Sequence, residues 1–356
     1  MRIGIDARLV GGSSTGDSTY WTGLLHGLSK LSPDAEFLLY TNAAQPAEIP
    51  SHPSFRWNVL PGRSGRWWSF VQFPLRARAD GCDVIHTQYA LSPLVGRRGV
   101  TTIHDVSFRI GPHWFRTKDR FLLNALVPRA ARRARKVITV SETSKKDLVS
   151  HLGLEPAKIA VTPLAPSHKL KNVPSTQAEP MLAELGVRRP YLLSVGTRWP
   201  RKNMRLAVEA VDLLPADLPH RLVLTGKSGW GESGNSSRLQ TIGYVEERLL
   251  AALYSSADLY LAPSHYEGFG LTILEAFTCG CPVLCSVGGA QAEVAGDAAH
   301  VLAEEEPEAW AGAMKDLLTD SSKLQSMREK GLLRVGQFSW TETATRTLQV
   351  YREVAS

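Results

Sequence analysis

The sequence predicts an α/β protein of two doubly wound, Rossmann-like domains whose parallel sheets face an interdomain cleft. Its 356 residues are too many for one ordinary core and suit two domains of roughly 150 residues each. Short apolar strands alternate with helical stretches in both halves, and a proline-rich segment at residues 164–190 separates the two series. Ligands of such sheets bind beyond the carboxyl ends of the strands, so we expect the active site in the cleft.

The first half contains a series of short apolar segments that are bounded by turn residues and rich in β-branched side chains, as buried parallel strands are. They lie at residues 2–7, 36–41, 55–60, 83–87, 100–104, 136–140 and 159–163. Helical patterns fit residues 18–30, 116–135 and 142–152, and Ser141 is the expected N-cap of the last.

The second half repeats this alternation. Strands are expected at residues 191–196, 221–225, 241–245, 258–262, 282–287 and 299–302, and helices at 204–214, 246–255 and 271–279. Residues from Pro307 onward look helical, ending in a helix at 341–354. We therefore expect an N-terminal domain at 1–168, a linker at 169–189 with a short helix near 181–185, a C-terminal domain at 190–337, and a final segment at 338–356 that packs back on the N-terminal domain.

Hydropathy and cysteine content predict a cytoplasmic protein. The N-terminus carries charges inside its apolar run, which is typical of a first strand and not of a signal peptide. No run approaches the roughly 18 apolar residues that a spanning helix needs. The four cysteines, Cys82, Cys279, Cys281 and Cys285, lack the spacing of a zinc site, so we interpret them as small buried hydrophobic residues.

The formal charge of +7 is concentrated toward the N-terminus. Residues 1–185 hold 24 Lys and Arg against 14 Asp and Glu, whereas the remaining residues hold 17 against 20. The excess is densest at residues 116–136. A basic helix face either binds phosphates of nucleic acid or anionic lipid, or is simply solvated. No nucleic-acid motif accompanies this charge, so we expect no nucleic-acid partner, whereas peripheral contact with an anionic membrane stays open.

A strand–loop–helix segment at residues 259–279 has the pattern of a phosphate site. An apolar strand ends at Ala262, a loop with Gly268 and Gly270 follows, and a helix begins near Leu271. Free backbone N–H groups at a helix start bind anions, and glycines let the backbone approach a ligand closely. Glu267 and Glu275 flank this site and suit hydrogen bonds to hydroxyl groups on either side of it. The alternative is an ordinary helix start with an acid in solvent.

The loop at residues 196–203 crowds cations at the carboxyl end of another strand. Gly196 ends the strand, and Arg198, Arg201 and Lys202 lie in the loop before the helix at Met204. Cations in this position can neutralise a diphosphate and stabilise the charge on a departing one. Taken alone, however, the segment fits a basic surface loop better.

The first half offers weaker signals. The segment Val10-Gly-Gly-Ser-Ser-Thr-Gly-Asp-Ser-Thr-Tyr20 follows the first strand but does not match G-x-G-x-x-G. His104 and Asp105 end a strand and would face the cleft in a parallel sheet, although such a pair is more often structural. No Asp-x-Asp occurs, which argues against a divalent metal held that way.

An aromatic and basic segment contains Trp67 and Trp68 between arginines and phenylalanines. It is interpreted as an acceptor rim or a membrane-surface helix. The alternative is that Phe70 and Phe73 are core residues at helical spacing.

Together these motifs resemble the retaining GT-B glycosyltransferases of family 4 (glycosyl transferases group 1) over nearly the whole length. The resemblance rests on Gly196-Thr-Arg-Trp-Pro-Arg-Lys-Asn203, Gly243-Tyr-Val245, Ala257-Asp-Leu-Tyr-Leu-Ala-Pro-Ser264 and Glu267-Gly-Phe-Gly-Leu-Thr-Ile-Leu-Glu275, in this order and spacing. Ile103-His-Asp-Val-Ser-Phe108 and the loop at Gly16 add support. Arg-Lys-Asn at 201–203 is similar to the mannosyltransferase branch.

The resemblance implies a role for each matching residue. Arg198 and Lys202 would hold the donor diphosphate, and Glu275 would bind the ribose hydroxyls. Glu267 would bind the donor sugar, and His104 would lie near its anomeric carbon, so both join Arg198 and Lys202 as catalytic candidates. Further donor contacts would come from Gly12, Gly16, Gly196, Tyr244, Val245, Gly268, Phe269, Gly270, Leu271 and Thr272. Independently of the resemblance, we take Asp105, Trp67 and Trp68 as the candidates for contact with the acceptor.

The implied reaction is a metal-independent transfer of a hexose with retention and without a cofactor. GDP-mannose is the favoured donor and a UDP-sugar the next. The acceptor would be a saccharide or a lipid-linked glycan in surface-polysaccharide or glycoconjugate synthesis. The alternatives are a small-molecule acceptor or a non-catalytic sugar-nucleotide-binding protein. One departure is Ser18, where the family commonly has a second glycine, so the first loop matches the family pattern less closely than the loops of the second half.

Overall fold

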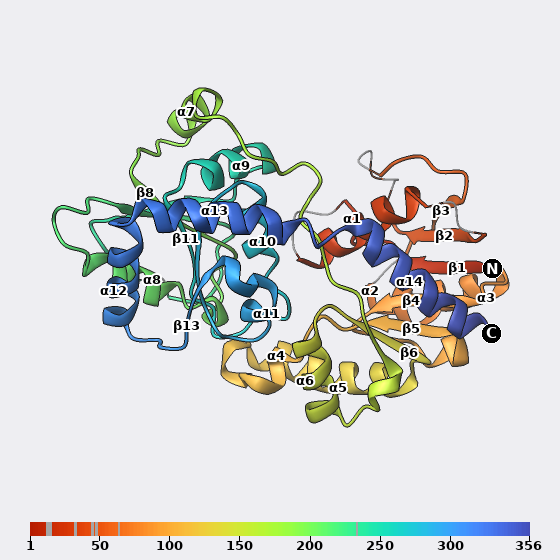
Figure 1. Ribbon diagram of the computed structural model, residues 1–356. Coiled ribbons are helices and arrows are strands. Elements are labelled where there is room, and N and C mark those ends of the chain that lie inside the picture. The colour runs from red at the N-terminus through yellow and green to blue at the C-terminus, as the bar shows by residue number, and fades with distance from the viewer. Residues whose placement is uncertain (12–15, 32–33, 44–45, 47–48, 63–64, 233) are drawn as a thin grey trace. The chain divides into compact units, whose positions relative to one another are not determined.

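A computed structural model describes the chain except for residues 12–15, 32–33, 44–45, 47–48, 63–64 and 233 (Figure 1). The chain divides into two compact units. Unit 1 comprises Met1–Ala165 together with Ser339–Ser356, and unit 2 comprises Pro166–Phe338. Each unit is an α/β body with its own parallel sheet and its own apolar core.

In the described residues of unit 1, seven parallel strands pair in the order β3-β2-β1-β4-β5-β6-β7. Because consecutive strands do not all pair, helices must cross over the sheet, which is the doubly wound arrangement. The strands are β1 (Arg2–Asp6), β2 (Glu36–Thr41), β3 (Phe55–Val59), β4 (Val84–Gln88), β5 (Gly99–Thr102), β6 (Lys136–Thr139) and β7 (Ile159–Val161).

Helices α5, α6 and α14 pack against strands of this sheet, and α14 lies beside α1 although more than 300 residues separate them in the sequence (Figure 1). The helical segments are α1 (Gly16–Ser29), α2 (Gly65–Trp67), η1 (Trp68–Gln72), α3 (Phe73–Ala79), η2 (Pro93–Arg98), α4 (Ser107–Ile110), η3 (Pro112–Trp114), α5 (Thr117–Arg133), α6 (Glu142–Leu152), η4 (Pro156–Lys158) and α14 (Trp340–Ala355).

In the described part of unit 2, six parallel strands pair in the order β10-β9-β8-β11-β12-β13. They are β8 (Tyr191–Val195), β9 (Arg221–Thr225), β10 (Leu239–Gly243), β11 (Leu259–Ala262), β12 (Val283–Ser286) and β13 (His300–Leu302). The helical segments are α7 (Ser175–Glu184), η5 (Pro200–Lys202), α8 (Met204–Asp212), α9 (Glu247–Ser256), α10 (Leu271–Thr278), α11 (Gln291–Ala295), η6 (Gly296–Ala298), α12 (Pro307–Leu318) and α13 (Ser321–Val335).

The predicted strands are all present, each within two residues of the expected ends. The strand expected at 241–245 is instead β10, which begins two residues earlier and ends at Gly243. Residues 169–189, where a linker is predicted, belong to unit 2 and contain the ten-residue helix α7, which packs against α9. The short segments α4 and α11 have no counterpart in the prediction, whereas α2, η1 and the start of α3 cover the aromatic segment for which helical spacing was one of the alternatives.

The four cysteines are buried and unbridged, which confirms their interpretation as small apolar residues. Burial raises the pKa of Cys82 to about 11 and that of Cys279 to about 12, so these thiols stay protonated. None of the helices in the described ranges combines the length and apolar composition that crossing a bilayer requires.

Candidate functional site

Glu267 in the β11–α10 loop is clamped by two cations from the β8–α8 loop. Arg201 Nη1 lies 2.8 Å from one carboxylate oxygen and Lys202 Nζ lies 2.6 Å from the other. Ser264 Oγ donates a further hydrogen bond of 2.7 Å. Burial raises the pKa of this carboxyl group, but Arg201 and Lys202 outweigh burial and lower the pKa to about 2. Glu267 is therefore a fixed anion at neutral pH, held at the carboxyl end of the sheet.

A pair of glycines after β12 holds the backbone of Glu267. The Ala290 N–H donates to the Glu267 carbonyl oxygen at 2.8 Å. Gly289 has a positive φ of 65°, and a Cβ atom there would lie 2.2 Å from the same oxygen. A Cβ on Gly288 would lie 2.3 Å from the carbonyl oxygen of His265. Only glycine fits at these positions, and the Gly-Gly pair after a predicted strand was the signal that could have found them.

The Arg198 loop is secured by the loop that follows β9. The Arg198 N–H donates to the Lys227 carbonyl at 3.2 Å, and the Gly231 N–H donates to the Arg198 carbonyl at 2.8 Å. Arg198 Nη2 donates to Ser228 Oγ at 2.9 Å. Gly196, with a φ of 146°, leaves room for the Lys202 side chain, because a Cβ there would lie 3.2 Å from Lys202 Cε.

The start of α10 places the remaining predicted donor residues of this loop. Gly270, Leu271 and Thr272 form its first turn, and Gly270 has a φ of 104°. Phe269 is buried and packs edge-on against Phe338, so its contribution to a ligand would come from its backbone, as would that of Gly268 beside it. Tyr244 is half exposed after β10, and Val245 is buried.

Glu275 lies one turn into α10 and differs sharply from Glu267. It accepts a hydrogen bond of 3.2 Å from Tyr254 Oη, and no cation contacts it among the described residues. Burial raises the pKa of Glu275 to about 7, against the opposing effects of Tyr254 and Lys202. Its carboxyl group is therefore close to half protonated at neutral pH and gains from any hydrogen-bond donor that a ligand brings.

In unit 1, His104 follows β5, is buried and contacts two polar neighbours that are only partly buried. Gln88 Nε2 contacts His104 Nε2 and donates to Asp17 Oδ1 at 2.9 Å. Burial lowers the pKa of His104, although Asp17 and Asp105 oppose this. Asp105 accepts hydrogen bonds from the Ser107 N–H at 2.8 Å and Ser107 Oγ at 2.6 Å, so it also organises the start of α4.

A buried chain of hydrogen bonds lies beneath His104 and reaches α14. Tyr20 Oη and His86 Nε2 both lie 2.8 Å from Thr102 Oγ1. His86 Nδ1 lies 2.6 Å from Tyr351 Oη. Burial lowers the pKa of His86 to about 3, so the chain is uncharged. The Tyr20 ring contacts His104 edge-on, with 5.0 Å between ring centroids.

The remaining predicted residues of unit 1 differ in how far they are exposed to solvent. Gly16 is exposed at the start of α1, and Gly12 lies outside the described residues. Trp67 is exposed, whereas the Trp68 ring is buried, stacks on Phe73 and donates from Nε1 to the Leu60 carbonyl at 2.9 Å. Trp68 therefore belongs to the core in this structure, and only Trp67 can contact an acceptor with its ring.

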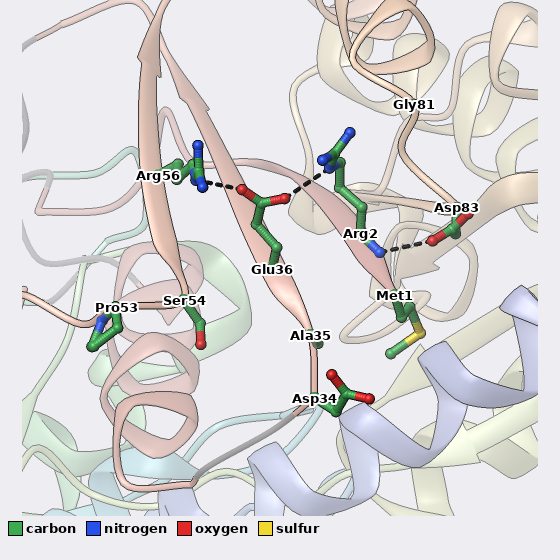
Figure 2. A pocket seen from close by; sticks show the side chains of 10 residues that line it. All are labelled: Met1, Arg2, Asp34, Ala35, Glu36, Pro53, Ser54, Arg56, Gly81 and Asp83. Carbon is green, nitrogen blue, oxygen red and sulfur yellow. Dashed lines mark hydrogen bonds and ion pairs between the residues drawn. The ribbon is translucent and has the colours of Figure 1, made fainter.

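A cavity of about 580 Å³ opens at the amino ends of β1 and β2 (Figure 2). Its two arginines, Arg2 and Arg56, both pair with Glu36, and the Arg2 N–H donates to Asp83 at 2.7 Å. Because the charges are already paired, this cavity offers no excess charge to a phosphate, and it lies at the sheet edge opposite to His104. No cluster of His, Cys, Asp and Glu able to hold a metal occurs in the described ranges.

Comparison with known proteins identifies the class to which this fold and these loops belong. Residues 16–165 match the profile described as glycosyltransferase family 4, and residues 183–334 match glycosyl transferases group 1. O-antigen chain mannosyltransferase B of Escherichia coli is 33% identical over 270 residues, which cover 72% of this chain and 70% of that protein. The chain therefore belongs to the family 4 (group 1) glycosyltransferases, which act with retention.

Other relatives and solved structures support the assignment at the level of family and fold. D-inositol 3-phosphate glycosyltransferase of Kineococcus radiotolerans is 29% identical over 316 residues, covering 76% of this chain and 71% of that protein. Sucrose-phosphate synthase from Thermosynechococcus elongatus superimposes with a TM-score of 0.76 at 21% identity, covering 99% of each chain. Anabaena HepE, solved with UDP and glucose, gives a TM-score of 0.74 at 17% identity, covering 99% of this chain and 100% of that one. These likenesses confirm the GT-B fold.

Proposed function

We propose that this enzyme transfers a hexose from a nucleotide sugar, with GDP-mannose favoured over a UDP-sugar, to a saccharide or lipid-linked acceptor in surface-polysaccharide or glycoconjugate synthesis. The observation that carries the proposal is the Glu267 clamp. A buried carboxylate held ionised by Arg201 and Lys202 presents a rigid acceptor for sugar hydroxyls, with cations beside it for phosphate. The sequence similarity to a mannosyltransferase supports mannose.

In this proposal unit 2 binds the donor. Arg198 and Lys202 hold the diphosphate, Lys202 using protons that remain after its contact with Glu267. The first turn of α10 supplies backbone N–H groups to phosphate. Glu267 binds the sugar, Glu275 binds the ribose hydroxyls, and the backbone near Tyr244 and Val245 borders the base. Asp105 and Trp67 of unit 1 are proposed to contact the acceptor.

The proposed mechanism is front-face transfer without a protein nucleophile. The bond between the anomeric carbon and the diphosphate breaks as the acceptor oxygen bonds to the same face of that carbon. The acceptor's proton passes to the leaving diphosphate, whose growing charge Arg198 and Lys202 stabilise. Holding both partners in register supplies the rest of the acceleration.

The donor is tested by thermal shift with GDP, UDP, ADP and dTDP, followed by turnover of the matching sugar nucleotide. We expect GDP to give the largest shift, since a ligand at a hundred times its Kd adds about 2.7 kcal/mol of stability. Arg198→Ala should lower turnover of GDP-mannose by about 10²–10³ while leaving the unfolding midpoint unchanged. Arg205→Ala, an exposed arginine on α8, is the matched control. A shift with UDP alone moves the proposal to a UDP-sugar, and near-normal turnover by Arg198→Ala contradicts the mechanism.

A small-molecule acceptor is the second candidate, because several relatives of 28–29% identity carry the name D-inositol 3-phosphate glycosyltransferase. Transfer to an inositol phosphate but not to a saccharide would favour it. A non-catalytic sugar-nucleotide-binding protein remains a third alternative, and it requires binding without release of a nucleoside diphosphate.

Peripheral contact with an anionic membrane is supported by α5. Phe121 is 77% exposed there, beside Lys118 and Arg120, and a basic face with an exposed aromatic ring favours interfacial binding. Salt-sensitive flotation with anionic vesicles, reduced in Phe121→Ser, tests this.

A further inference from the structure

Two polar side chains, Gln88 and Asp17, lie beside His104 where the strands of unit 1 end. Gln88 is the last residue of β4, and Asp17 lies in the first turn of α1. Gln88 Nε2 contacts both the Nε2 atom of His104 and, at 2.9 Å, the Oδ1 atom of Asp17. The direct separation of Asp17 Oδ1 and His104 Nε2 is 3.7 Å, which is too long for a hydrogen bond. Gln88 therefore bridges the other two.

The direction of these hydrogen bonds follows from the donors available. An amide nitrogen has two protons, and the Asp17 carboxylate accepts one of them. The second points to His104 Nε2, which can accept it only when this ring nitrogen carries no proton. The opposite amide orientation would set the Gln88 oxygen against a carboxylate, so two acceptors would face each other. Burial raises the pKa of Asp17, whereas the 45% of its side chain that stays exposed and the hydrogen bond from Gln88 favour the charged carboxylate.

We infer that Gln88 and Asp17 are positioning residues that hold His104 as its neutral Nδ1–H tautomer, so that His104 serves the reaction as a hydrogen-bond donor and not as a base. The inference rests on the proposed function, because His104 contacts a donor sugar only if the protein is the transferase that we propose. Burial also lowers the pKa of His104, which favours the neutral ring. The rings of Tyr20 and Tyr89, at 5.0 and 5.7 Å between centroids, fix its plane.

The Nδ1 atom of His104 is the one left for a ligand. Within the described residues, no hydrogen bond to Nδ1 is formed, whereas Nε2 is occupied by Gln88. A neutral Nδ1–H can donate to a sugar hydroxyl or phosphate oxygen and stabilise charge there. His104 keeps its proton throughout. The proton lost by the acceptor hydroxyl as the new glycosidic bond forms then goes to the leaving diphosphate, and the transfer balances without a histidine base.

The tautomer can be measured directly in the full-length protein without substrate. In ¹⁵N-histidine-labelled protein, long-range ¹H–¹⁵N correlation distinguishes a protonated ring nitrogen from an unprotonated one. The chain has 10 histidines, and the signal missing in His104→Gln assigns His104. We expect Nδ1 protonated and Nε2 unprotonated near neutral pH. A wild-type His104 with a protonated Nε2 overturns the inference.

Substitutions at Gln88 and Asp17 test the cause. Gln88→Glu replaces the donor by an acceptor, so Nε2 should become protonated. Gln88→Ala and Asp17→Asn should each give a mixture of the two tautomers. Gln349→Glu makes the same chemical change on the exposed face of α14 and should leave the His104 signals unchanged. A variant counts as folded when the other histidine signals are kept. If the His104 signals are unchanged in all folded variants of Gln88 and Asp17, the positioning role is contradicted.

Kinetics separates this inference from the proposed function. With a donor that is turned over, Gln88→Glu should lower kcat by about tenfold or more with little change in KM, because the ring is still present but misdirects its proton. If no sugar nucleotide is turned over by the wild type, the proposed function fails while the tautomer measurement still stands. If the tautomer inverts in Gln88→Glu and kcat is unaffected, the donor role of His104 is wrong.

Discussion

At the scale of single residues, two glutamates, one in the β11–α10 loop and one in α10, show how neighbouring groups set the pKa of a carboxyl group. Glu267 and Glu275 are both largely withdrawn from solvent, and burial raises the pKa of each. Two cations in contact reverse the effect for Glu267 and lower its pKa to about 2, whereas Glu275 lacks such contact and its pKa is about 7. One carboxylate is thus permanently ionised, and the other is poised to respond to a ligand.

The poised state of Glu275 predicts that nucleotide binding releases a proton. Ribose hydroxyls that donate to this carboxylate favour its ionised form and lower its pKa. We expect GDP to bind more tightly as pH rises through about 7 and to release up to one proton in that window. The free energy of unfolding without ligand changes with pH in the opposite direction to GDP affinity. The raised pKa of Glu275 stabilises the fold below pH 4.5, and this stabilisation is lost as the pH rises to about 7.

Calorimetric titrations in buffers of different ionisation enthalpy measure this proton release. The phosphates of GDP also titrate, but equally in the wild type and in Glu275→Gln. The variant should therefore release less by the amount due to Glu275. The same proton count in both proteins at pH 6.5 to 7.5 would show that Glu275 does not respond to the nucleotide.

The composition of the site was predictable from the sequence, but its pairing was not. Residues 198–202 clearly form a cationic loop next to an acidic one. That Arg201, and not Arg198, contacts Glu267 depends on the tight turn η5, which directs neighbouring side chains apart. Gln88 and Asp17 are separated by more residues than a local sequence motif spans. Only the pairing of β1, β4 and β5 brings them to His104.

At the scale of elements, α14 packs on α1 so closely that two glycines are required. A Cβ on Gly23 would lie 2.1 Å from the Trp340 ring, and one on Gly27 would lie 2.0 Å from the Trp340 carbonyl oxygen. Backbone and ring of α14 therefore occupy the space that any larger residue would need. Tyr351, further along α14, meets His86 in the core of the sheet.

This packing predicts that Gly27→Ala destabilises unit 1. Alanine favours a helix by up to about 1 kcal/mol over glycine, but overpacking typically costs about 1–3 kcal/mol, and here the obstacle is backbone. We expect a net loss of about 2 kcal/mol in urea unfolding. Gly312→Ala on α12 is the control, because nothing lies within 4 Å of its Cβ position, and it should be neutral or stabilising. Equal stability of the two variants would contradict a close α1–α14 contact.

The strands could be predicted because buried parallel strands are apolar throughout and end at turn residues, as at 36–41 and 221–225. For the segment 65–79 the helical spacing was visible only around Phe70 and Phe73, and its bounds could not be predicted, because it changes from α to π geometry and contains Pro74. The helix α7 contains Pro180 and follows Pro174, and these prolines led us to predict a linker. A helix forms there because α7 packs against α9.

At the scale of the whole molecule, the path of the chain makes the two units unequal. Unit 2 is one continuous stretch, whereas unit 1 needs both ends of the chain. The end that returns carries Trp340, Leu348 and Tyr351, which are buried. Unit 1 thus cannot complete its core without α14, while unit 2 is formed by the continuous stretch 166–338.

This inequality predicts the outcome of truncation. A chain that ends at Phe338 loses the helix that covers α1 and leaves His86 Nδ1 without its Tyr351 partner, which alone costs about 1–3 kcal/mol. We expect the truncated chain to keep the unfolding transition of unit 2 and to lose that of unit 1. Urea unfolding monitored by circular dichroism and tryptophan fluorescence measures both transitions. The isolated fragment 166–338 should unfold cooperatively on its own. A chain ending at Val354 keeps Tyr351 and should behave as the full length does, whereas an unchanged unit 1 transition in the chain ending at Phe338 would mean that α14 is dispensable for the fold.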